Sequence, residues 1–323
     1  MKILMVGEAA NHKQKLSDAL AAPVDIATLP REASYQADWD DRIEPDDIVI
    51  SLRLKRPAGR LPPFRLLHVP GAGLDGIDMV ALAASVEVCN VFEHEIPIAE
   101  YVLGQMLNHE IRFDDLRRSM SAESWSDVYR NRVPHGELFG RTVGIIGFGR
   151  IGRAIATRAK AFGMRILALD INDPGDGLAN EVMKPADLNR LLPQLDYCVV
   201  TCPLSGATHS MIGHEQLSAM KKTALVVNVS RAEIVEEKAL FDALENGVIG
   251  GAVLDVWYRY PTGADDHVPP SRFDFAKLPN AVCTPHSSAW TTALPGRRYR
   301  FIASNIDRLL RGEPRLNVVR AAH

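Results

Sequence analysis

The strongest chemical signal in the sequence is a glycine-rich turn that follows an apolar run. In TVGIIGFGRIG (142–152) the spacing is Gly147-x-Gly149-x-x-Gly152, and a helical pattern follows. Such a turn lets the backbone approach a pyrophosphate, which the first N–H groups of the helix can bind. Asp170 ends the next apolar run, where its carboxylate would accept hydrogen bonds from a ribose and repel a 2′-phosphate. This context predicts a dinucleotide site that takes NAD rather than NADP. Glycines needed only for packing are the alternative.

Two residues that could carry acid–base or anion-binding chemistry follow later apolar runs. Arg231 comes directly after LVVNVS (225–230), and His286 comes directly after AVCTP (281–285). A guanidinium can bind a carboxylate through two hydrogen bonds, and an imidazole changes its charge near neutral pH. Ligands bind at the carboxyl ends of parallel strands, so both side chains are expected at that edge. Taken singly, a surface arginine and a structural histidine are the commoner cases.

Short apolar runs alternate with helical patterns along the chain, which indicates parallel α/β sheets. The first set of strand candidates is 2–7, 24–29, 47–52, 65–73 and 86–91. The second set is 142–149, 165–170, 197–204, 224–230, 251–257 and 281–288. One long helical pattern over 96–120 lies between the sets and could connect two lobes. The final segment reads as an amphipathic helix with an extended end that could fold back on the first lobe.

Bulk properties favour an ordinary cytoplasmic enzyme. The 323 residues carry a net charge of −3, which gives no electrostatic reason to expect nucleic acid or a membrane as a partner. No apolar run is long enough to span a bilayer, and the opening MKILMVG reads as a strand rather than a signal peptide. The four cysteines lack a CxxC spacing, so we expect neither a metal site nor a disulfide framework.

Together these motifs resemble the D-isomer-specific 2-hydroxyacid dehydrogenase family over nearly the whole chain. The matching segments are GAGLDGID (71–78), AEYVL (99–103), TVGIIGFGRIG (142–152), CPLSGATHSMI (202–212), VNVSRAEIVEEKAL (227–240), GAVLDVW (251–257) and TPH (284–286). The resemblance implies an α/β protein of two lobes, with a Rossmann-type NAD-binding domain (99–290) inserted in a flavodoxin-like substrate domain (1–98 and 291–323). It also implies a homodimer and a small anionic substrate.

The resemblance further implies a role for each motif residue. Arg231 would anchor the substrate carboxylate and polarise its carbonyl, and His286 would act as the acid–base. The backbone N–H groups of Ala72, Gly73 and Leu74 would hold the carboxylate. The implied cofactor residues are Gly147, Gly149, Arg150, Ile151, Gly152, Asp170, Cys202, Pro203, Thr208, Val229 and Asp255.

The sequence departs from the family at the partner of the histidine. Most members read Asp-Val-Phe/Tyr-Glu-Pro-Glu-Pro here, and the second Glu pairs with the catalytic histidine. Counted from Asp255, that position is Tyr260. A phenol can still bond an imidazole but stabilises the imidazolium less than a carboxylate does, so we expect a lower pKa for His286 than in Glu-bearing relatives. Asp265 or Asp266 could substitute for the missing Glu, although a solvated acidic loop is the commoner case.

The substrate side offers weaker candidates. His94 lies where many relatives have small polar residues, and it could contact substrate or be structural. Arg53 and Lys55 follow a strand end and could bind an anion, although such basic runs are more often solvated. Trp257 and Trp290 could line a cleft, but core packing is the usual role of tryptophan.

The sequence therefore predicts an NAD-dependent oxidoreductase that interconverts a small 2-hydroxy acid and its 2-oxo acid by hydride transfer. One alternative is an oxidoreductase for another small anion, as in the formate and phosphite branches of the family. Another is an NAD-sensing regulatory protein, because the family includes a transcriptional corepressor.

Overall fold

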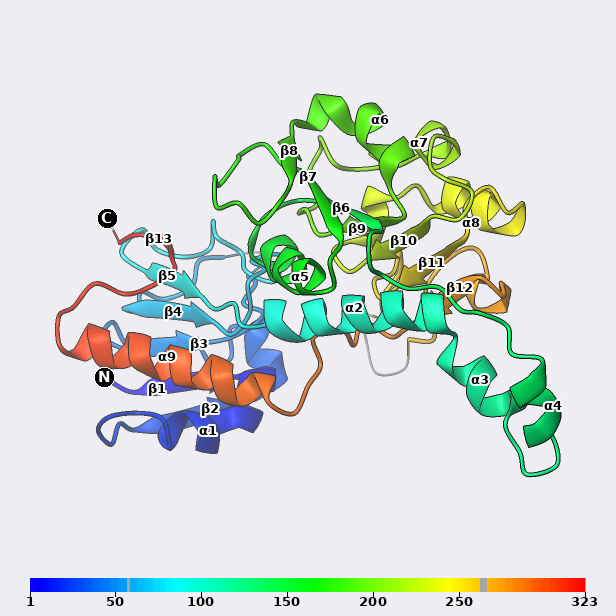
Figure 1. The fold of residues 1–323 in the computed structure, drawn as a ribbon. Helices are drawn as coiled ribbons and strands as arrows, with labels where there is room; N and C mark the ends of the chain where they lie inside the picture. Colours follow the sequence, from blue (N-terminus) through cyan, green and yellow to red (C-terminus); the bar gives the residue numbers. More distant parts are fainter. Residues whose placement is uncertain (57–58, 262–265, 323) are drawn as a thin grey trace. The chain divides into compact units, whose positions relative to one another are not determined.

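The computed structural model of the chain describes residues 1–56, 59–261 and 266–322 (Figure 1). Its Cα positions group into two compact units. We call residues 1–93 with 291–323 the terminal unit and residues 94–290 the central unit. Each unit is built around a largely parallel sheet, so the predicted α/β class with two parallel-sheet domains is confirmed.

The sheet of the terminal unit has the order β13-β5-β4-β3-β1-β2. Its strands are β1 (Ile3–Val6), β2 (Ile26–Leu29), β3 (Ile48–Ile50), β4 (Leu66–Val69), β5 (Glu87–Asn90) and β13 (Val318–Arg320). The first five strands are parallel in the order 2-1-3-4-5, which is the flavodoxin-like order. The extended end of the chain adds β13 antiparallel to β5, so this tail returns to the first sheet.

One long helix covers a face of this sheet. Helix α9 (Leu294–Leu310) inserts Ile302 and Ile306 among strand residues such as Ile3 and Ile50. The other helical elements of the unit are short: η1 (Gly7–His12), α1 (Lys13–Ser17), η2 (Arg31–Ser34) and η3 (Asp40–Arg42).

The sheet of the central unit has the order β12-β11-β10-β9-β6-β7-β8. Its strands are β6 (Thr142–Ile146), β7 (Arg165–Leu169), β8 (Glu181–Met183), β9 (Tyr197–Val200), β10 (Leu225–Asn228), β11 (Gly251–Leu254) and β12 (Ala281–Cys283). Each neighbouring pair of strands in this order is parallel. If the strands of this unit are numbered along the chain, their order from the β8 edge is 3-2-1-4-5-6-7. This is the Rossmann order 3-2-1-4-5-6 with a seventh strand, β12, added at the edge.

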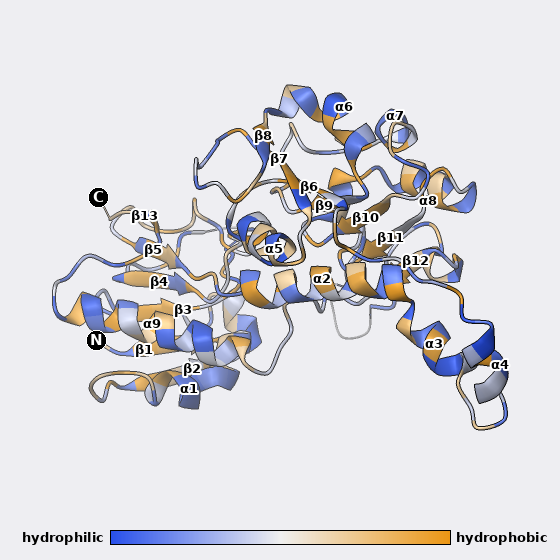
Figure 2. Cartoon of the chain, viewed as in Figure 1, coloured by the Kyte–Doolittle hydropathy of each residue, from blue (hydrophilic) through white to orange (hydrophobic). Residues whose placement is uncertain are grey.

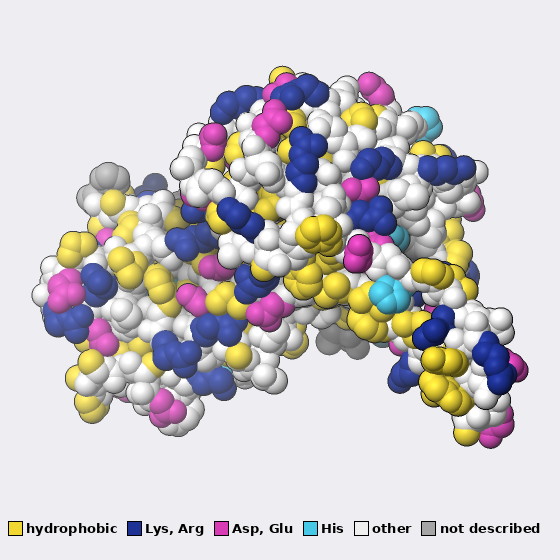
Figure 3. Space-filling view, viewed as in Figure 1, with side chains coloured by type: hydrophobic (Ala, Val, Ile, Leu, Met, Phe, Trp, Pro, Cys, Tyr) yellow, Lys and Arg dark blue, Asp and Glu magenta, His cyan; other side chains and the backbone are white. Residues whose placement is uncertain are grey.

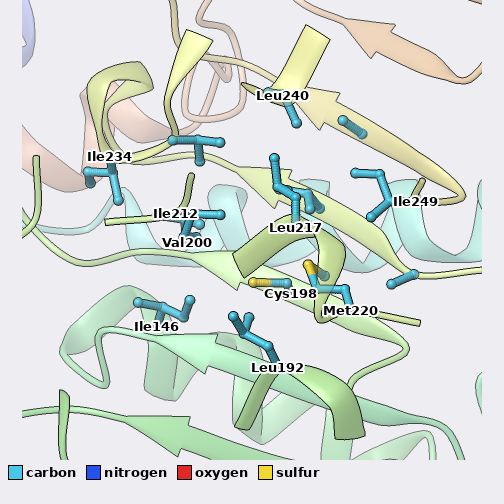
Figure 4. Close-up of a cluster of buried hydrophobic side chains, with 14 of the residues drawn as sticks. Ile146, Leu192, Cys198, Val200, Ile212, Leu217, Met220, Ile234, Leu240 and Ile249 are labelled. Atoms are coloured by element: carbon cyan, nitrogen blue, oxygen red, sulfur yellow. The ribbon is translucent and has the colours of Figure 1, made fainter. Parts of the chain in front are cut away.

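Helices cover both faces of this second sheet, because its strands are apolar on both sides (Figure 2). They are α2 (Glu95–Ile111), α5 (Arg150–Ala161), α6 (Leu188–Leu191), α7 (His214–Ser218) and α8 (Glu237–Glu245), with the turns η4 (Pro185–Asp187), η5 (Leu192–Gln194), η6 (Ala232–Ile234) and η7 (Phe275–Lys277). Strand β9 shows the division: Cys198 and Val200 join one core, with Leu217 and Leu240 (Figure 4), whereas Val199 joins the other. The strands are thereby fixed in register, with their carboxyl ends at one edge.

Two features of this unit differ from the sequence-based expectation. The single helix expected over 96–120 is wrong, because α2 ends at Ile111 and Arg112 takes a left-handed conformation before α3 (Phe113–Ser119) and α4 (Trp125–Arg130). Met106 is buried in the core, but about half of the surface of Phe113 is exposed. Beyond Ile111, core packing therefore no longer stabilises a continuation of α2 in the same direction. Strand β8 was not expected, because three residues carry too little pattern. Within the described residues, no helix is both long and apolar enough to cross a bilayer.

Candidate active site

The glycine turn joins β6 to α5 and is shaped by close contacts within the protein. Gly147 has a φ of 95°, and a β-carbon there would overlap the backbone of Cys202. A β-carbon at Gly152 would overlap the carbonyl of Gly147, so α5 packs directly on the turn. At Gly149, by contrast, no described atom lies within 4 Å of the place where a β-carbon would stand. The turn is therefore tightly packed against the protein at Gly147 and Gly152, and it has open space at Gly149, where a pyrophosphate would fit.

Asp170 lies directly after β7 and contacts the same turn. Its Oδ2 accepts a hydrogen bond from the N–H of Phe148 at 2.6 Å, and its Oδ1 accepts one from the N–H of Asn172 at 2.9 Å. These bonds fix the carboxylate beside the glycine turn. Because a carboxylate has about four acceptor positions, it can still accept hydrogen bonds from a ribose.

The other predicted cofactor residues lie at the carboxyl ends of the strands or just after them. Arg150 and Ile151 begin α5; Cys202, Pro203 and Thr208 follow β9; Val229 and Asp255 follow β10 and β11. The hydroxyl of Thr208 donates to the carbonyl of Pro203 at 2.7 Å, and the hydroxyl of Ser230 donates to the carbonyl of Cys202. The loops after β9 and β10 are thus bonded to one another. The open turn at Gly149 suits the pyrophosphate of a dinucleotide.

Arg231 lies at the end of β10, where Asn228 holds the backbone. The Asn228 amide donates to the carbonyl of Arg231 at 3.0 Å and accepts from the N–H of Ser230 at 3.1 Å. The side chain of Arg231 is exposed and donates to the carbonyl of Ser230 at 2.8 Å. Sequence reasoning missed Asn228, although a polar residue that ends a buried apolar run is the signal that could have found it.

The structure brings His286 and Tyr260 into direct contact. The Tyr260 hydroxyl lies 2.8 Å from Nδ1 of His286 and accepts a hydrogen bond from the N–H of Trp257 at 3.0 Å. Burial raises the pKa of the Tyr260 phenol, which therefore stays protonated at neutral pH. A neutral hydroxyl thus bonds the histidine at the position where most of the family carries a carboxylate.

The charges around His286 favour its neutral form. Burial lowers the pKa of His286, the positive charge of Arg231 lowers it further, and the carboxylate of Asp255 only partly offsets these effects. Arg231, Asp255 and His286 follow the adjacent strands β10, β11 and β12, which explains why they act on one another. The arrangement supplies one fixed cation, one buried anion and one group that can exchange a proton.

Asp255 is completely buried, and the described hydrogen bonds of its carboxylate are with the segment that carries His286. Its Oδ1 accepts from the Thr284 hydroxyl at 2.6 Å and from the N–H of Ser287 at 2.8 Å, and its Oδ2 accepts from the N–H of Ser288 at 2.9 Å. Sequence reasoning placed Asp255 near the nicotinamide and missed this anchoring contact. The contact depends on the pairing of β11 with β12, which no local pattern shows.

The weaker substrate candidates divide between the two units. Ala72, Gly73 and Leu74 follow β4 in the terminal unit, where Asn90 donates to the carbonyl of Ala72 at 3.0 Å. His94 is the residue before α2 in the central unit. In the terminal unit the Arg53 guanidinium donates to the Tyr35 hydroxyl at 3.2 Å, and the N–H of Lys55 donates to the carbonyl of Ser34 at 2.8 Å.

The two tryptophans and the acidic loop have different surroundings. Trp257 is buried, and its indole N–H donates to the carbonyl of Thr284 at 2.9 Å, so it supports the histidine segment. Trp290 is 78% exposed. Asp265 lies outside the described residues, and Asp266 is the first residue described after that gap.

Comparison with known proteins settles the family. A family model described as the NAD binding domain of D-isomer specific 2-hydroxyacid dehydrogenases matches residues 103–288. The chain belongs to this family. As a member, it is 40% identical over 263 residues to the glyoxylate reductase of Korarchaeum cryptofilum, a match that covers 80% of this chain and 76% of the relative. It is 31% identical over 322 residues to the glycerate dehydrogenase of Methylorubrum extorquens, covering 94% and 97% of the two chains.

A further relative and a solved structure support the same family. The D-3-phosphoglycerate dehydrogenase of Methanocaldococcus jannaschii is 35% identical over 261 residues, which cover 79% of this chain but only 47% of that relative. The D-isomer specific 2-hydroxyacid dehydrogenase of Lactobacillus delbrueckii ssp. bulgaricus, in its NAD complexed form, superposes with a TM-score of 0.78 at 25% identity over 99% of this chain and 100% of that one. The predicted family and a nicotinamide cofactor are therefore confirmed.

Proposed function

We propose that this chain is an NAD-dependent enzyme that interconverts a small 2-hydroxy acid and its 2-oxo acid by hydride transfer. The observation that carries the proposal is the grouping of Arg231, Asp255 and His286 after three adjacent strands of the sheet that also carries the glycine turn. A cation and a proton-exchanging group beside a nicotinamide site form the arrangement that carbonyl reduction requires. Relatives named as glyoxylate reductase and glyoxylate/hydroxypyruvate reductase support glyoxylate and hydroxypyruvate as the substrates to test first.

In this proposal each side chain has one task. Arg231 binds the substrate carboxylate and stabilises the negative charge that develops on the carbonyl oxygen during reduction. His286 donates a proton to that oxygen, or accepts the hydroxyl proton in the oxidation direction. Tyr260 holds Nδ1 of the imidazole. Hydride donation and acceptance come from the nicotinamide ring when the cofactor is bound.

The family resemblance extends the assignment to further residues. We assign the backbone N–H groups of Ala72, Gly73 and Leu74 to the substrate carboxylate, and we propose His94 as a further substrate contact. The substrate domain would comprise 1–98 with 291–323, and the NAD-binding domain 99–290.

The cofactor residues favour NAD. The glycine turn and the start of α5 would hold the pyrophosphate, and Asp170 would accept hydrogen bonds from the adenosine ribose. A 2′-phosphate beside the Asp170 carboxylate would bring like charges together, and this repulsion disfavours NADP.

A second copy of the chain is the proposed partner, and helices α3 and α4 offer the surface. Apolar side chains gather on this segment (Figure 3), and they are about half exposed. They are Phe113, Leu116, Met120, Trp125 and Tyr129. Burying such a patch against its counterpart would favour a homodimer.

The direct test is NADH oxidation against a panel that includes glyoxylate and hydroxypyruvate. We expect turnover with at least one 2-oxo acid, and we expect His286→Ala to abolish it while NADH binding is retained. Micromolar NADH binding without turnover of any acid would favour the regulatory alternative. NAD reduction by formate or phosphite, without 2-oxo acid turnover, would favour the alternative of another small anion.

A further inference from the structure

The segment that carries His286 is held by a chain of hydrogen bonds that begins on helix α2. The Tyr101 hydroxyl lies 2.7 Å from Oγ1 of Thr284, and the Thr284 hydroxyl lies 2.6 Å from Oδ1 of Asp255. All these groups belong to the central unit. They join α2 to the ends of β11 and β12.

The direction of this chain follows from counting protons. An ionised carboxylate only accepts hydrogen bonds, so the single hydroxyl proton of Thr284 is donated to Asp255. The Tyr101 hydroxyl must then donate to Thr284. Burial raises the pKa of the Tyr101 phenol, which keeps this proton on Tyr101 throughout the neutral range. The chain therefore runs from Tyr101 through Thr284 to Asp255.

The same segment is fixed on its backbone as well. The Thr284 carbonyl accepts from the indole of Trp257 at 2.9 Å and from the N–H of His286 at 3.0 Å. On the far side of the histidine, the N–H groups of Ser287 and Ser288 both donate to Asp255. Between these anchors His286 has a φ of 56°, a left-handed conformation that is unfavourable for a residue with a β-carbon. The anchors compensate for this cost.

We propose that Tyr101 and Thr284 are positioning residues for the acid–base His286. By ordering the Asp255 carboxylate and the strained backbone beside it, they fix where the imidazole meets Tyr260 and the substrate. This inference rests on the function proposed above. Neither residue touches the reacting atoms in this account, so their effect is on the rate of proton transfer and not on cofactor binding.

Thr284→Val tests the inference, because it removes the hydroxyl at nearly constant volume. We expect kcat to fall on the order of tenfold, as small displacements of a catalytic group do, while the Kd for NADH changes by less than about twofold. The Asp255 carboxylate raises the pKa of His286. If the segment moves away from Asp255 in the variant, the pKa of His286 should fall, and activity in the reduction direction should be lost at a lower pH than in the wild type. Thr284→Ser keeps the donor and should restore both the rate and the pH profile.

Tyr101→Phe supplies a second test, with Tyr197→Phe as a matched control. Tyr101→Phe should also lower kcat, by a smaller factor than Thr284→Val does. Tyr197 is also a tyrosine with a hydrogen-bonded hydroxyl, which it donates to Glu110. It is the first residue of β9 and so lies at the edge formed by the amino ends of the strands, opposite the edge that His286 follows. We expect the control to keep the wild-type kcat and pH profile.

The His286 imidazole can also be titrated by NMR without substrate, which separates this inference from the proposed function. A lower pKa of His286 in Thr284→Val and Tyr101→Phe, but not in Tyr197→Phe, supports the positioning role even if the substrate panel fails. Wild-type imidazole titration in both variants overturns the role, and so does wild-type kcat in both when the wild-type protein turns over a 2-oxo acid.

Discussion

The Tyr260 hydroxyl stands 2.8 Å from Nδ1 of His286, in the position that most of the family gives to a glutamate. A phenol bonds the imidazole without adding a negative charge, while burial and Arg231 already lower the pKa of His286. In the reduction direction the histidine must be protonated to donate. Reductase activity is therefore lost as the pH rises through the pKa of His286, and a lower pKa of His286 moves this loss to lower pH.

Tyr260→Glu should raise the pKa of His286, because a carboxylate stabilises the imidazolium that a phenol leaves without a counter-charge. We expect the alkaline limb of kcat for reduction to move to higher pH in this variant. Tyr260→Phe should not move it upward, because that variant adds no charge. The measurement is the pH dependence of kcat with saturating NADH, and an unchanged alkaline limb in Tyr260→Glu would contradict the role of this pair.

Asp170 is held beside the glycine turn by the N–H of Phe148 and so can discriminate between cofactors. Asp170→Ala should lower the preference for NADH over NADPH, because the like charge beside the 2′-phosphate is removed. We expect the ratio of kcat/KM values to fall by roughly tenfold or more, and equal wild-type use of both cofactors would refute the assignment.

The positions of single residues were predictable only where their signal is local. The glycine spacing and Asp170 lie within one strand–turn–helix unit, and Tyr260 could be counted from Asp255. The anchoring contacts of Asp255 lie 29 to 33 residues away in the sequence. They arise from the adjacency of β11 and β12, which a sequence pattern does not reveal.

Helix α9 is bonded to the sheet of the terminal unit through a buried polar pair. The Asn305 amide donates to the imidazole of His68 on β4 at 3.1 Å and to the carbonyl of Leu316 at 2.8 Å. Burial lowers the pKa of His68 to about 4. The folded unit therefore requires a neutral histidine, whereas the unfolded chain protonates it near its usual value of 6.5.

This difference predicts acid sensitivity. As pH falls below about 6.5 the unfolded chain binds a proton that the folded unit does not, so stability decreases until about pH 4, by roughly 3 kcal/mol. His68→Gln keeps an acceptor for Asn305 but does not titrate. Urea unfolding followed by circular dichroism should show a smaller stability loss from pH 7.5 to 4.5 in the variant, and equal losses would exclude this origin.

The elements themselves were largely predictable from the sequence. Each predicted strand contains the observed one, because buried parallel strands read as continuous apolar runs. The break at Arg112 was not predictable, since the helical pattern continues through it and only the loss of burial marks the end of α2. Strand β8 was not predicted, because its three residues form a strand only by pairing with β7 in the folded protein.

The chain as a whole combines two α/β units, and the restart of the strand rhythm near residue 142 made this division visible in the sequence. The exposed apolar patch on α3 and α4 was not visible, because a sequence pattern does not distinguish apolar side chains that pack in a core from those that lie on the surface. Exposure separates the two cases: Leu116 is 47% exposed, and Trp125 is 49% exposed.

The double variant Leu116→Asp with Trp125→Asp should weaken the proposed dimer, because two charges would have to be buried in each copy. Sedimentation velocity should then show a shift toward the monomer. Val80→Asp is a matched control, since Val80 is 90% exposed in the terminal unit. A monomeric wild-type protein, or a dimer unaffected by the double variant, would rule out this interface.

The most direct test of the central claim follows the hydride itself. NADH carrying deuterium in both C4 positions of the nicotinamide is incubated with the 2-oxo acid that the panel identifies, and the product is analysed by NMR and mass spectrometry. Transfer to the carbonyl carbon predicts a 2-hydroxy acid with one deuterium at C2, formed by the wild-type protein and not by His286→Ala. A product without deuterium at C2, or labelled product formed equally well by the variant, would contradict the account.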